Sequence, residues 1–201
     1  MGAFDFIDCG AHLGLFSAQF VAHSYGVRQL TLIEPNRELF PLMESNIRGA
    51  RAEQVRCVNA ALSDFEGRGR LVMPEYGTDA DALFLVPDPA GDVDVITLSS
   101  VLRSRTHSNA AIKVDAEGQE GPILRGAKDA IRALAKVALI VEVHKKVLDR
   151  IGVSDVSMME EIDAIRPLRW VNAQDGAPVN PHRSIFGQLG AGAWDLIGVS
   201  E

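Results

Sequence analysis

The sequence predicts an α/β protein whose mostly parallel sheet has helices on both faces and an antiparallel edge strand. Short apolar runs alternate with helical patterns along most of the chain, which is the arrangement of βαβ units. Several of these runs are apolar at every position, as expected of parallel strands buried on both faces. We therefore expect residues 1–201 to form a single domain, with a small β insertion at about 67–100.

The composition bounds the classes of function. The hydrophobic content of 47% suffices for a core, and a net charge of −7 argues against nucleic-acid binding, which needs a basic surface. With only Cys9 and Cys57, a disulfide framework is not expected and a cytoplasmic location is the default. No apolar run is long enough for a membrane span, and Asp5 and Asp8 interrupt any signal peptide.

The first predicted strand leads into a glycine-bearing loop. Phe6 and Ile7 form a short apolar run that ends at Asp8, and a Gly-x-x-x-Gly turn from Gly10 to Gly14 follows. Glycine allows a ligand to pass close to the backbone, so a side chain at Gly10 would occupy the ligand's path. The helix that follows Gly14 points its N-terminal N–H groups toward the same place.

The second predicted strand, residues 30–33, ends at Glu34, which follows Gly14 by 20 residues. An acid in this position of a βαβ unit holds the ribose hydroxyls of a nucleoside. A dinucleotide site would need Gly-x-Gly-x-x-Gly, but His12 replaces the middle glycine. The loop therefore favours S-adenosylmethionine, whose amino-acid tail stands in place of phosphates. The alternative is a strand–helix turn in an unrelated α/β domain.

The next elements continue the alternation. Residues 15–25 and 37–48 have apolar side chains at helical spacing. Residues 55–58 are predicted as a third strand. The small residues after it, around Ala61, would let an adenine ring lie against the backbone, although a simple connection explains them equally well.

The alternation is then interrupted. Residues 67–74 and 93–98 are predicted as strands, and the segment 75–92 between them is rich in Asp, Pro and Gly. Such a composition is typical of a loop, which we interpret as mobile or substrate-facing. This region is an insertion in the α/β pattern and not a domain boundary.

The final third returns to strands and helices. Residues 111–115 and 138–144 are predicted as core strands, and a helix is expected after Pro122. A further helix at 155–165 follows Ser154 as its N-cap. The tail segments 168–171 and 194–199 would form the antiparallel edge.

Titratable side chains stand at or just beyond the carboxyl ends of the predicted parallel strands. Packing does not explain them, because a buried acid costs free energy unless it is paired. In an open α/β sheet the ligand crevice lies outside these strand ends. We therefore expect one cleft to contain Asp8, Glu34, Asp115, Glu117, Glu142 and His144.

Several segments resemble the FkbM family of S-adenosylmethionine-dependent methyltransferases, and their order and spacing match over about residues 4–145. The Ile-Lys-x-Asp-x-Glu-Gly block that starts at Ile112 is the most specific, whereas the glycine loop alone would indicate only a class I methyltransferase. The segments are 8–14, 34–36, 61–64 with Gly67, 112–118 with Glu120, and 141–144.

The resemblance implies a Rossmann-like seven-stranded class I methyltransferase sheet and methyl transfer mostly to hydroxyl oxygens of sugars and natural products. Asp115 and Glu117 would stand at the methyl end of the cofactor, and Glu34 would take the ribose hydroxyls. The remaining contacts that the resemblance implies are Asp8, Gly10, Ala11 and Gly14 at the methionine part, and Asn36 and Ala61 at the adenine. The chain departs from the family at His12, which replaces the usual Asn, and at Ser99, which replaces a usual acid.

An alcohol acceptor must lose its proton as the new bond forms, and a carboxylate or imidazole within hydrogen-bond reach can take it. The candidates are His144, Asp115 and Glu117. His144 ranks first, because an imidazole titrates close to neutral pH. The same three side chains could bind a metal ion, but their spacing is not that of a tight ligand set, so no metal is expected.

Two other functions remain open: a non-catalytic protein that binds S-adenosylmethionine, and, with less support, an NAD-dependent oxidoreductase. The expected partner is a small acceptor such as a hydroxylated sugar, a lipid or a polyketide-like molecule. The first strand starts close to Met1, so a lid over the cleft would have to come from elsewhere, for example from a second copy in an oligomer.

Overall fold

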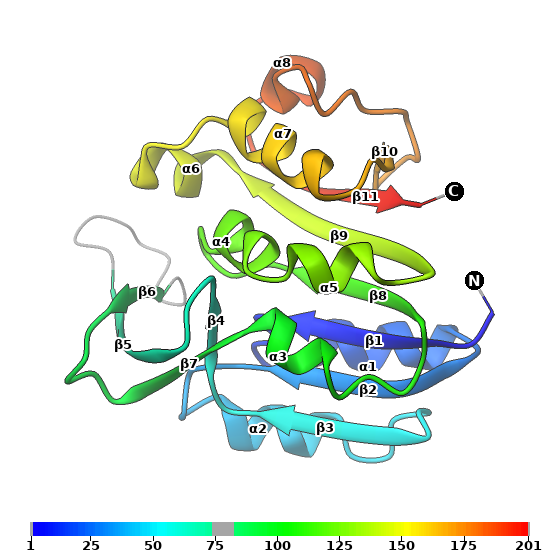
Figure 1. Ribbon diagram of the computed structural model, residues 1–201, viewed down its shortest axis with the longest axis vertical. Coiled ribbons are helices and arrows are strands. Elements are labelled where there is room, and N and C mark those ends of the chain that lie inside the picture. The colour runs from blue at the N-terminus through cyan, green and yellow to red at the C-terminus, as the bar shows by residue number, and fades with distance from the viewer. Residues whose placement is uncertain (1, 74–82, 201) are drawn as a thin grey trace.

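The computed structural model describes residues 2–73 and 83–200, and its main feature is a seven-stranded sheet (Figure 1). The strand order is β10-β11-β9-β8-β1-β2-β3. The central strand β1 (Phe4–Cys9) is fully buried and pairs in parallel with β2 (Val27–Ile33) and β8 (Asn109–Val114). Their carboxyl ends therefore lie at one edge of the sheet.

Two helices connect the first three strands. α1 (Leu15–His23) joins β1 to β2, and α2 (Phe40–Asn46) joins β2 to β3 (Gln54–Val58). Both helices lie on the same face of the sheet (Figure 1). α2 is shorter than the predicted helix 37–48. Pro41 lies in its first turn, where the missing N–H leaves no hydrogen bond unmade.

The rest of the large sheet is built from the C-terminal part of the chain, and α4, α5 and α7 cover the face opposite to α1 and α2 (Figure 1). The elements are α4 (Glu120–Arg125), α5 (Lys128–Arg132), β9 (Lys136–His144), α6 (Lys145–Ile151), α7 (Asp155–Ile165), β10 (Arg169–Asn172), α8 (Ile185–Leu189) and β11 (Ala193–Val199).

The helix predicted after Pro122 is in fact two short helices, α4 and α5. They are separated near Gly126, where a Cβ atom would lie 2.8 Å from the Cα atom of Asp64. The backbone at Gly126 thus packs directly against the chain beyond β4 (Ala61–Ser63). This contact between distant segments, rather than local helix propensity, decides where the first helix ends.

The antiparallel strand lies inside the sheet, and the prediction of an antiparallel edge strand is wrong on this point. β11 pairs antiparallel with both β9 and β10, so β10 at the edge runs parallel to the other strands. The chain reaches the edge first and then returns between β10 and β9. This return places Asp195 of β11 directly opposite Glu142 of β9.

A second, four-stranded sheet has the order β4-β7-β5-β6 and stands beside the carboxyl edge of the large sheet (Figure 1). β5 (Gly67–Val72) and β7 (Val93–Thr97) confirm the two strands predicted there, and α3 (Leu98–Leu102) follows β7. The predicted loop 75–92 is partly wrong, because β6 (Phe84–Pro87) pairs with β5. Residues 75–82 of that loop, and Pro74 at the end of the predicted strand 67–74, lie outside the described residues.

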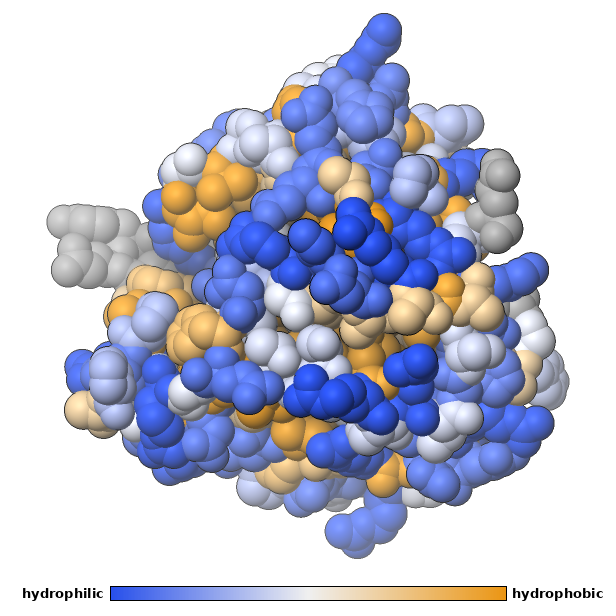
Figure 2. Space-filling model, viewed as in Figure 1, coloured by the Kyte–Doolittle hydropathy of each residue, from blue (hydrophilic) through white to orange (hydrophobic). Residues whose placement is uncertain are grey.

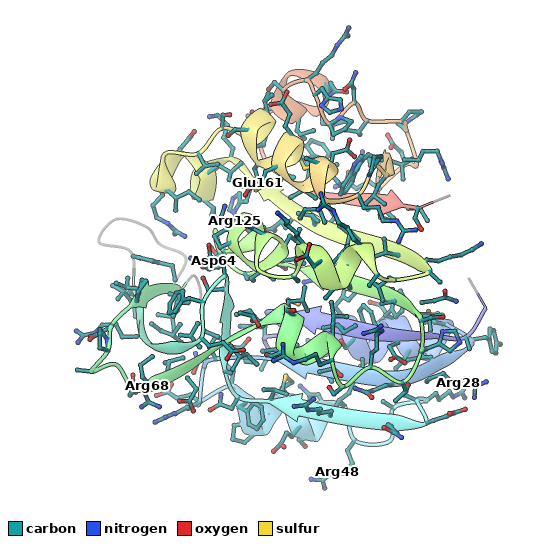
Figure 3. All side chains as sticks on the ribbon, in the orientation of Figure 1. Arg28, Arg48, Asp64, Arg68, Arg125 and Glu161 are labelled. Carbon is teal, nitrogen blue, oxygen red and sulfur yellow. The ribbon has the colours of Figure 1, made fainter. Side chains whose placement is uncertain are left out.

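A branched ion pair joins the second sheet to the helical layer. Arg125 of α4 pairs with Asp64, just beyond β4, at 3.0 Å and with Glu161 of α7 at 2.6 Å (Figure 3). Ion pairs at exposed positions contribute little singly. We therefore attribute the placement of these elements mainly to the buried apolar residues of α4 and α7, which include Ile123, Leu124 and Met159.

The surface on this side is mostly hydrophilic, with small apolar patches between charged side chains (Figure 2). Across residues 2–73 and 83–200, no helix is long and apolar enough to cross a membrane.

Candidate active site

A cavity of about 780 Å³ lies at the carboxyl ends of β1, β2, β8 and β9. Five of the six titratable side chains expected at one cleft line it: Glu34, Asp115, Glu117, Glu142 and His144. The second sheet and α6 form other parts of its wall. The remaining lining residues are Gly10, His12, Ile33, Pro35, Asn36, Leu39, Ala60, Ala61, Leu62, Leu71, Leu83, Leu85, Ala116, Gln119, Lys146, Val147 and Arg150.

Glu34 follows β2 and is almost completely buried, with 6% of its surface exposed. Each carboxylate oxygen accepts one backbone N–H: Oε2 from His12 at 2.8 Å and Oε1 from Asn36 at 2.8 Å. Burial raises the pKa of Glu34, although these two N–H groups oppose the shift. Because a carboxylate oxygen has two acceptor positions, each oxygen keeps one for a ligand hydroxyl.

The glycine loop between β1 and α1 serves the fold as much as any ligand. Gly10 has a φ of +82°, and a Cβ atom on it would lie 1.9 Å from the carbonyl oxygen of Asp115. Gly14, with a φ of +71°, packs against the Met43 side chain of α2. Gly10 lines the cavity, whereas Ala11 and Gly14 do not.

Asp8 lies at the end of β1 but does not line the cavity. Its side chain is fully buried, and one oxygen accepts the Ser17 hydroxyl at 2.6 Å. Lys113 stands opposite it in the strand register, with its Nζ atom 3.9 Å from Asp8 and 2.8 Å from Asp115. Burial lowers the pKa of Lys113, but the two carboxylates outweigh burial and raise it. A charged lysine thus holds Asp115 at the cavity.

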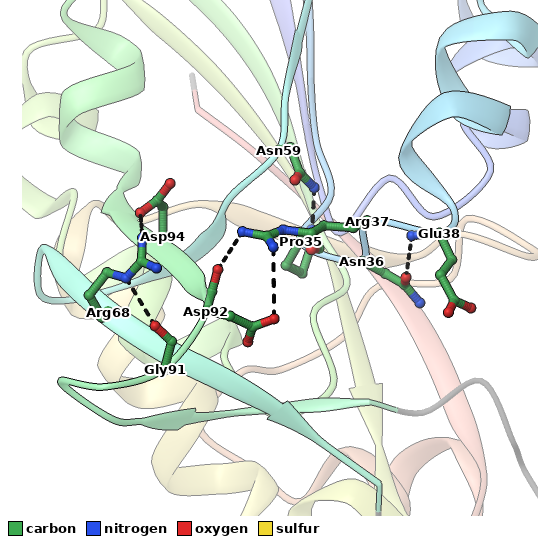
Figure 4. A network of polar contacts seen from close by, with 9 residues as sticks. All are labelled: Pro35, Asn36, Arg37, Glu38, Asn59, Arg68, Gly91, Asp92 and Asp94. Atoms are coloured by element: carbon green, nitrogen blue, oxygen red, sulfur yellow. Dashed lines mark hydrogen bonds and ion pairs between the residues drawn. The ribbon is translucent and has the colours of Figure 1, made fainter.

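Hydrogen bonds connect the part of the cavity that the sequence predicts for adenine to the second sheet. Asn36 and Ala61 both line the cavity. Asn59 donates its side-chain amide to the carbonyl of Glu34 at 2.8 Å. Arg37 donates to the carbonyl of Asp92, between β6 and β7, at 2.6 Å (Figure 4). These contacts fix the segment after β2 relative to the wall of the cavity.

A tight turn after β8 presents Asp115 and Glu117. Glu117 has a φ of +52°, an uncommon conformation for a residue with a side chain. Glu120 stabilises the turn, because its buried carboxylate accepts the backbone N–H groups of Ala116 at 2.9 Å and Gly118 at 3.2 Å. Sequence reasoning included Glu120 only in the family resemblance and gave it no role.

Helix α6 contributes cavity residues that the sequence analysis missed. Lys146, Val147 and Arg150 line the cavity. Arg150 donates to the carbonyl of Glu117 at 3.0 Å, lies 3.7 Å from its carboxylate and stands over the Phe84 ring of β6 at 5.0 Å. α6 therefore links the turn after β8 to the second sheet. Gly152, the left-handed residue after the helix, is the one sequence signal of its end.

Glu142 and His144 come from alternate positions of β9 and line the same cavity. Burial, followed by the charges of Asp115, Glu120, Asp195 and Glu117, raises the pKa of Glu142 to about 8. A carboxyl group of this kind exchanges its proton near neutral pH. The part of the chain that the structure describes contains no group of three or more His, Cys, Asp or Glu side chains that could hold a metal ion.

The family model of the methyltransferase FkbM domain matches residues 8–168. The chain belongs to this family. Methyl transfer from S-adenosylmethionine is the general chemistry that this membership indicates. The comparison with curated proteins found no match.

One solved methyltransferase structure shares the fold of this chain. The crystal structure of methyltransferase FkbM from Methylobacillus flagellatus KT has a TM-score of 0.62 and 19% identity, and the match covers 98% of this chain and 43% of that one. The chain thus spans less than half of that protein's length, and the likeness shows a shared fold only. A TehB-like SAM-dependent methyltransferase from Corynebacterium glutamicum has a TM-score of 0.49 and 11% identity, with 100% and 82% of the two chains covered.

Proposed function

We propose that this domain binds S-adenosylmethionine in the cavity and transfers its methyl group to a hydroxyl oxygen of a small acceptor, such as a sugar or a natural product. The observation that carries the proposal is the buried Glu34 carboxylate at the end of β2, with one acceptor position left on each oxygen. This is the arrangement that binds two neighbouring hydroxyls of a ribose. The strand order, with one antiparallel strand beside β9, supports the Rossmann-like class I assignment.

The residues around Glu34 fit the rest of the cofactor. Ala60, Ala61 and Leu62 offer small and apolar surface for an adenine ring, and Asn36 stands beside them in the lining. Asp115 and Glu117 offer negative charge toward a sulfonium and an amino group. Asp8, Ala11 and Gly14 do not line the cavity, so we assign them to the shape of the loop and not to direct contact.

When bound, S-adenosylmethionine supplies a methyl group already activated by its positive sulfur. The protein must therefore orient the acceptor, exclude water and receive one proton. The apolar residues Leu71, Leu85 and Val147 can exclude water from the cavity. The sequence-derived proton acceptors differ in their surroundings, because Asp115 is held by Lys113 and Glu117 faces Arg150, whereas His144 has no such cationic partner among the described residues.

Further properties belong to the same proposal. The domain acts as a single unit on a hydroxylated sugar, lipid or polyketide-like acceptor in the cytoplasm, without nucleic acid.

Glu34→Ala is expected to weaken the binding of S-adenosylmethionine by about 1.5–3 kcal/mol, the scale of lost hydrogen bonds to a charged group. Isothermal titration calorimetry measures this loss directly. Glu44→Ala is the matched control, because it removes an exposed carboxylate from neighbouring α2 and changes the net charge equally. Equal affinities in the two variants would contradict the ribose assignment.

The same titration separates the cofactor classes. The wild-type protein is expected to bind S-adenosylmethionine and not NAD, since the loop lacks the glycine that a pyrophosphate requires. The stability of Glu34→Ala must also be measured by thermal unfolding, because this variant leaves the N–H groups of His12 and Asn36 without their acceptor. Binding of NAD alone would overturn the proposed function.

A further inference from the structure

Glu142 differs from the other carboxylates of the cavity in its surroundings. Asp115 receives a hydrogen bond from Lys113 at 2.8 Å, Glu117 lies 3.7 Å from Arg150, and Glu34 accepts two backbone N–H groups. Within residues 2–73 and 83–200, Glu142 has no comparable donor or cation. Its charge is therefore the least compensated of the set.

The groups that face Glu142 from neighbouring elements are mostly negative. Asp195 stands directly opposite on β11, Asp115 and Glu117 follow β8, and Glu120 lies on α4. The cationic side chains nearby are engaged elsewhere: Lys113 with Asp8 and Asp115, and Arg150 with Glu117, while Lys146 is exposed to solvent. His144, two positions along β9, shares the cavity.

A proton is the remaining way to compensate a carboxylate in this position. Two acids opposite each other on adjacent strands repel when both are charged, so the ionisation of one disfavours the ionisation of the other. Burial raises the pKa of Asp195 as well, and the charge of Lys113 opposes this rise only in part. The proton of the pair therefore resides mainly on Glu142, the member that lines the cavity.

We propose that Glu142 is the catalytic residue that receives the proton of the acceptor hydroxyl, and that Asp195, directly opposite on β11, is a positioning residue that acts through Glu142. This inference rests on the proposed function. In the step, the acceptor oxygen forms its bond to the methyl carbon as the carbon–sulfur bond breaks, and sulfur keeps that electron pair. The electrons of the O–H bond remain on oxygen, and the proton passes to Glu142 in its ionised form, which predominates above a pH of about 8.

The proposal predicts how the relative affinity for S-adenosylmethionine and S-adenosylhomocysteine changes with pH. Below a pH of about 8 Glu142 is mostly protonated and neutral, and above it the side chain is negative. A negative Glu142 attracts the positive sulfonium of S-adenosylmethionine but not the neutral sulfur of S-adenosylhomocysteine. The preference for the former over the latter must therefore rise with pH, by about 4- to 15-fold between pH 6.5 and 9.5.

Calorimetric Kd values for both ligands across this pH range test the proposal without any acceptor. Glu142→Gln should abolish the change in relative affinity that is due to Glu142. Any pH dependence due to titration of the ligands themselves should remain. Asp195→Asn should move the midpoint to lower pH, which a merely structural role would not do. Both variants are checked by thermal unfolding.

The outcomes are distinguishable. Binding of both ligands with the same pH dependence in wild type and Glu142→Gln would overturn the role of Glu142 and leave the proposed function intact. Failure of both ligands to bind the wild-type protein would overturn the proposed function and this inference together. If Glu142→Gln does not fold, ¹³C NMR titration of glutamate carboxyl groups in the wild type decides instead. A set in which every resonance titrates below pH 6 contradicts the proposal.

Discussion

Gly10→Ala is expected to destabilise the fold by more than about 4 kcal/mol, a loss reached only when packing or backbone geometry is broken. The new Cβ atom would lie 1.9 Å from the carbonyl oxygen of Asp115, a distance that neither backbone segment can keep. β1 and β8 pair in the centre of the sheet, so neither strand can move away without loss of core packing. Ligand binding would be lost as a consequence of unfolding.

Gly49→Ala is the control that separates the steric overlap at Gly10 from the cost of placing alanine in a left-handed backbone conformation. Gly49 has a φ of +85°, close to the +82° of Gly10, but no atom lies near its Cβ position. Its alanine variant should lose only about 1–2 kcal/mol, the cost of a left-handed conformation. Urea unfolding followed by circular dichroism measures both. If Gly10→Ala were as stable as Gly49→Ala and yet failed to bind ligand, the glycine would serve the ligand's path, as the sequence suggested.

This comparison illustrates what the sequence could predict about the loop. A strand, a glycine turn and a helix follow one another within a few residues, and local pattern is enough to recognise them. The reason for Gly10 depends on Asp115, more than 100 residues away. A contact of this kind depends on which strands become neighbours, and periodicity does not specify strand order.

The cavity also has one part that the sequence predicted and one part that it did not. Titratable groups at successive strand ends predicted where a site would form, since parallel strands share an edge. Helix α6 was missed because it carries no strong local signal, whereas β6 lies in the segment that the sequence analysis interpreted as a mobile or substrate-facing loop. β6 is short, and α6 begins at Lys145, directly after the last residue of β9. The cavity residue Arg150 was therefore absent from the predicted site.

The position of β11 also affects the chemistry of the cavity. The sequence places Asp195 in a tail strand but does not say which strand it pairs with. Only the insertion of β11 between β9 and β10 brings Asp195 opposite Glu142. Burial and the charges of Asp115 and Glu120 raise the pKa of Glu142 most, and this pairing adds the charge of Asp195. Sequence reasoning placed Glu142 in the cleft, but it could not foresee these surroundings and ranked His144 first as the base.

Glu142→Gln is expected to lower kcat by about 10²–10⁴-fold, the usual cost of removing a general base. Glutamine keeps the size and hydrogen-bonding reach of the side chain but cannot receive the proton. At pH 7, below the pKa of about 8, Glu142 is mostly neutral before the reaction, so the affinity for S-adenosylmethionine should hardly change. A loss in kcat without a loss in cofactor affinity identifies an interaction made in the transition state.

An acceptor is first found by screening hydroxylated sugars for methylation by radiolabelled S-adenosylmethionine. Both kcat and the Kd for the cofactor are then measured for four variants: Glu142→Gln, His144→Ala, Asp115→Asn and Glu117→Gln. The sequence predicts the rate loss for His144→Ala or Asp115→Asn, and the cavity geometry predicts it for Glu142→Gln. The wild-type kcat should also rise with pH through about 8 and become independent of pH in this range once Glu142 is glutamine. A full rate in Glu142→Gln with a large loss in His144→Ala would identify His144, and not Glu142, as the proton acceptor. Full rates in all four variants would mean that orientation of the acceptor, and not proton removal, limits the reaction.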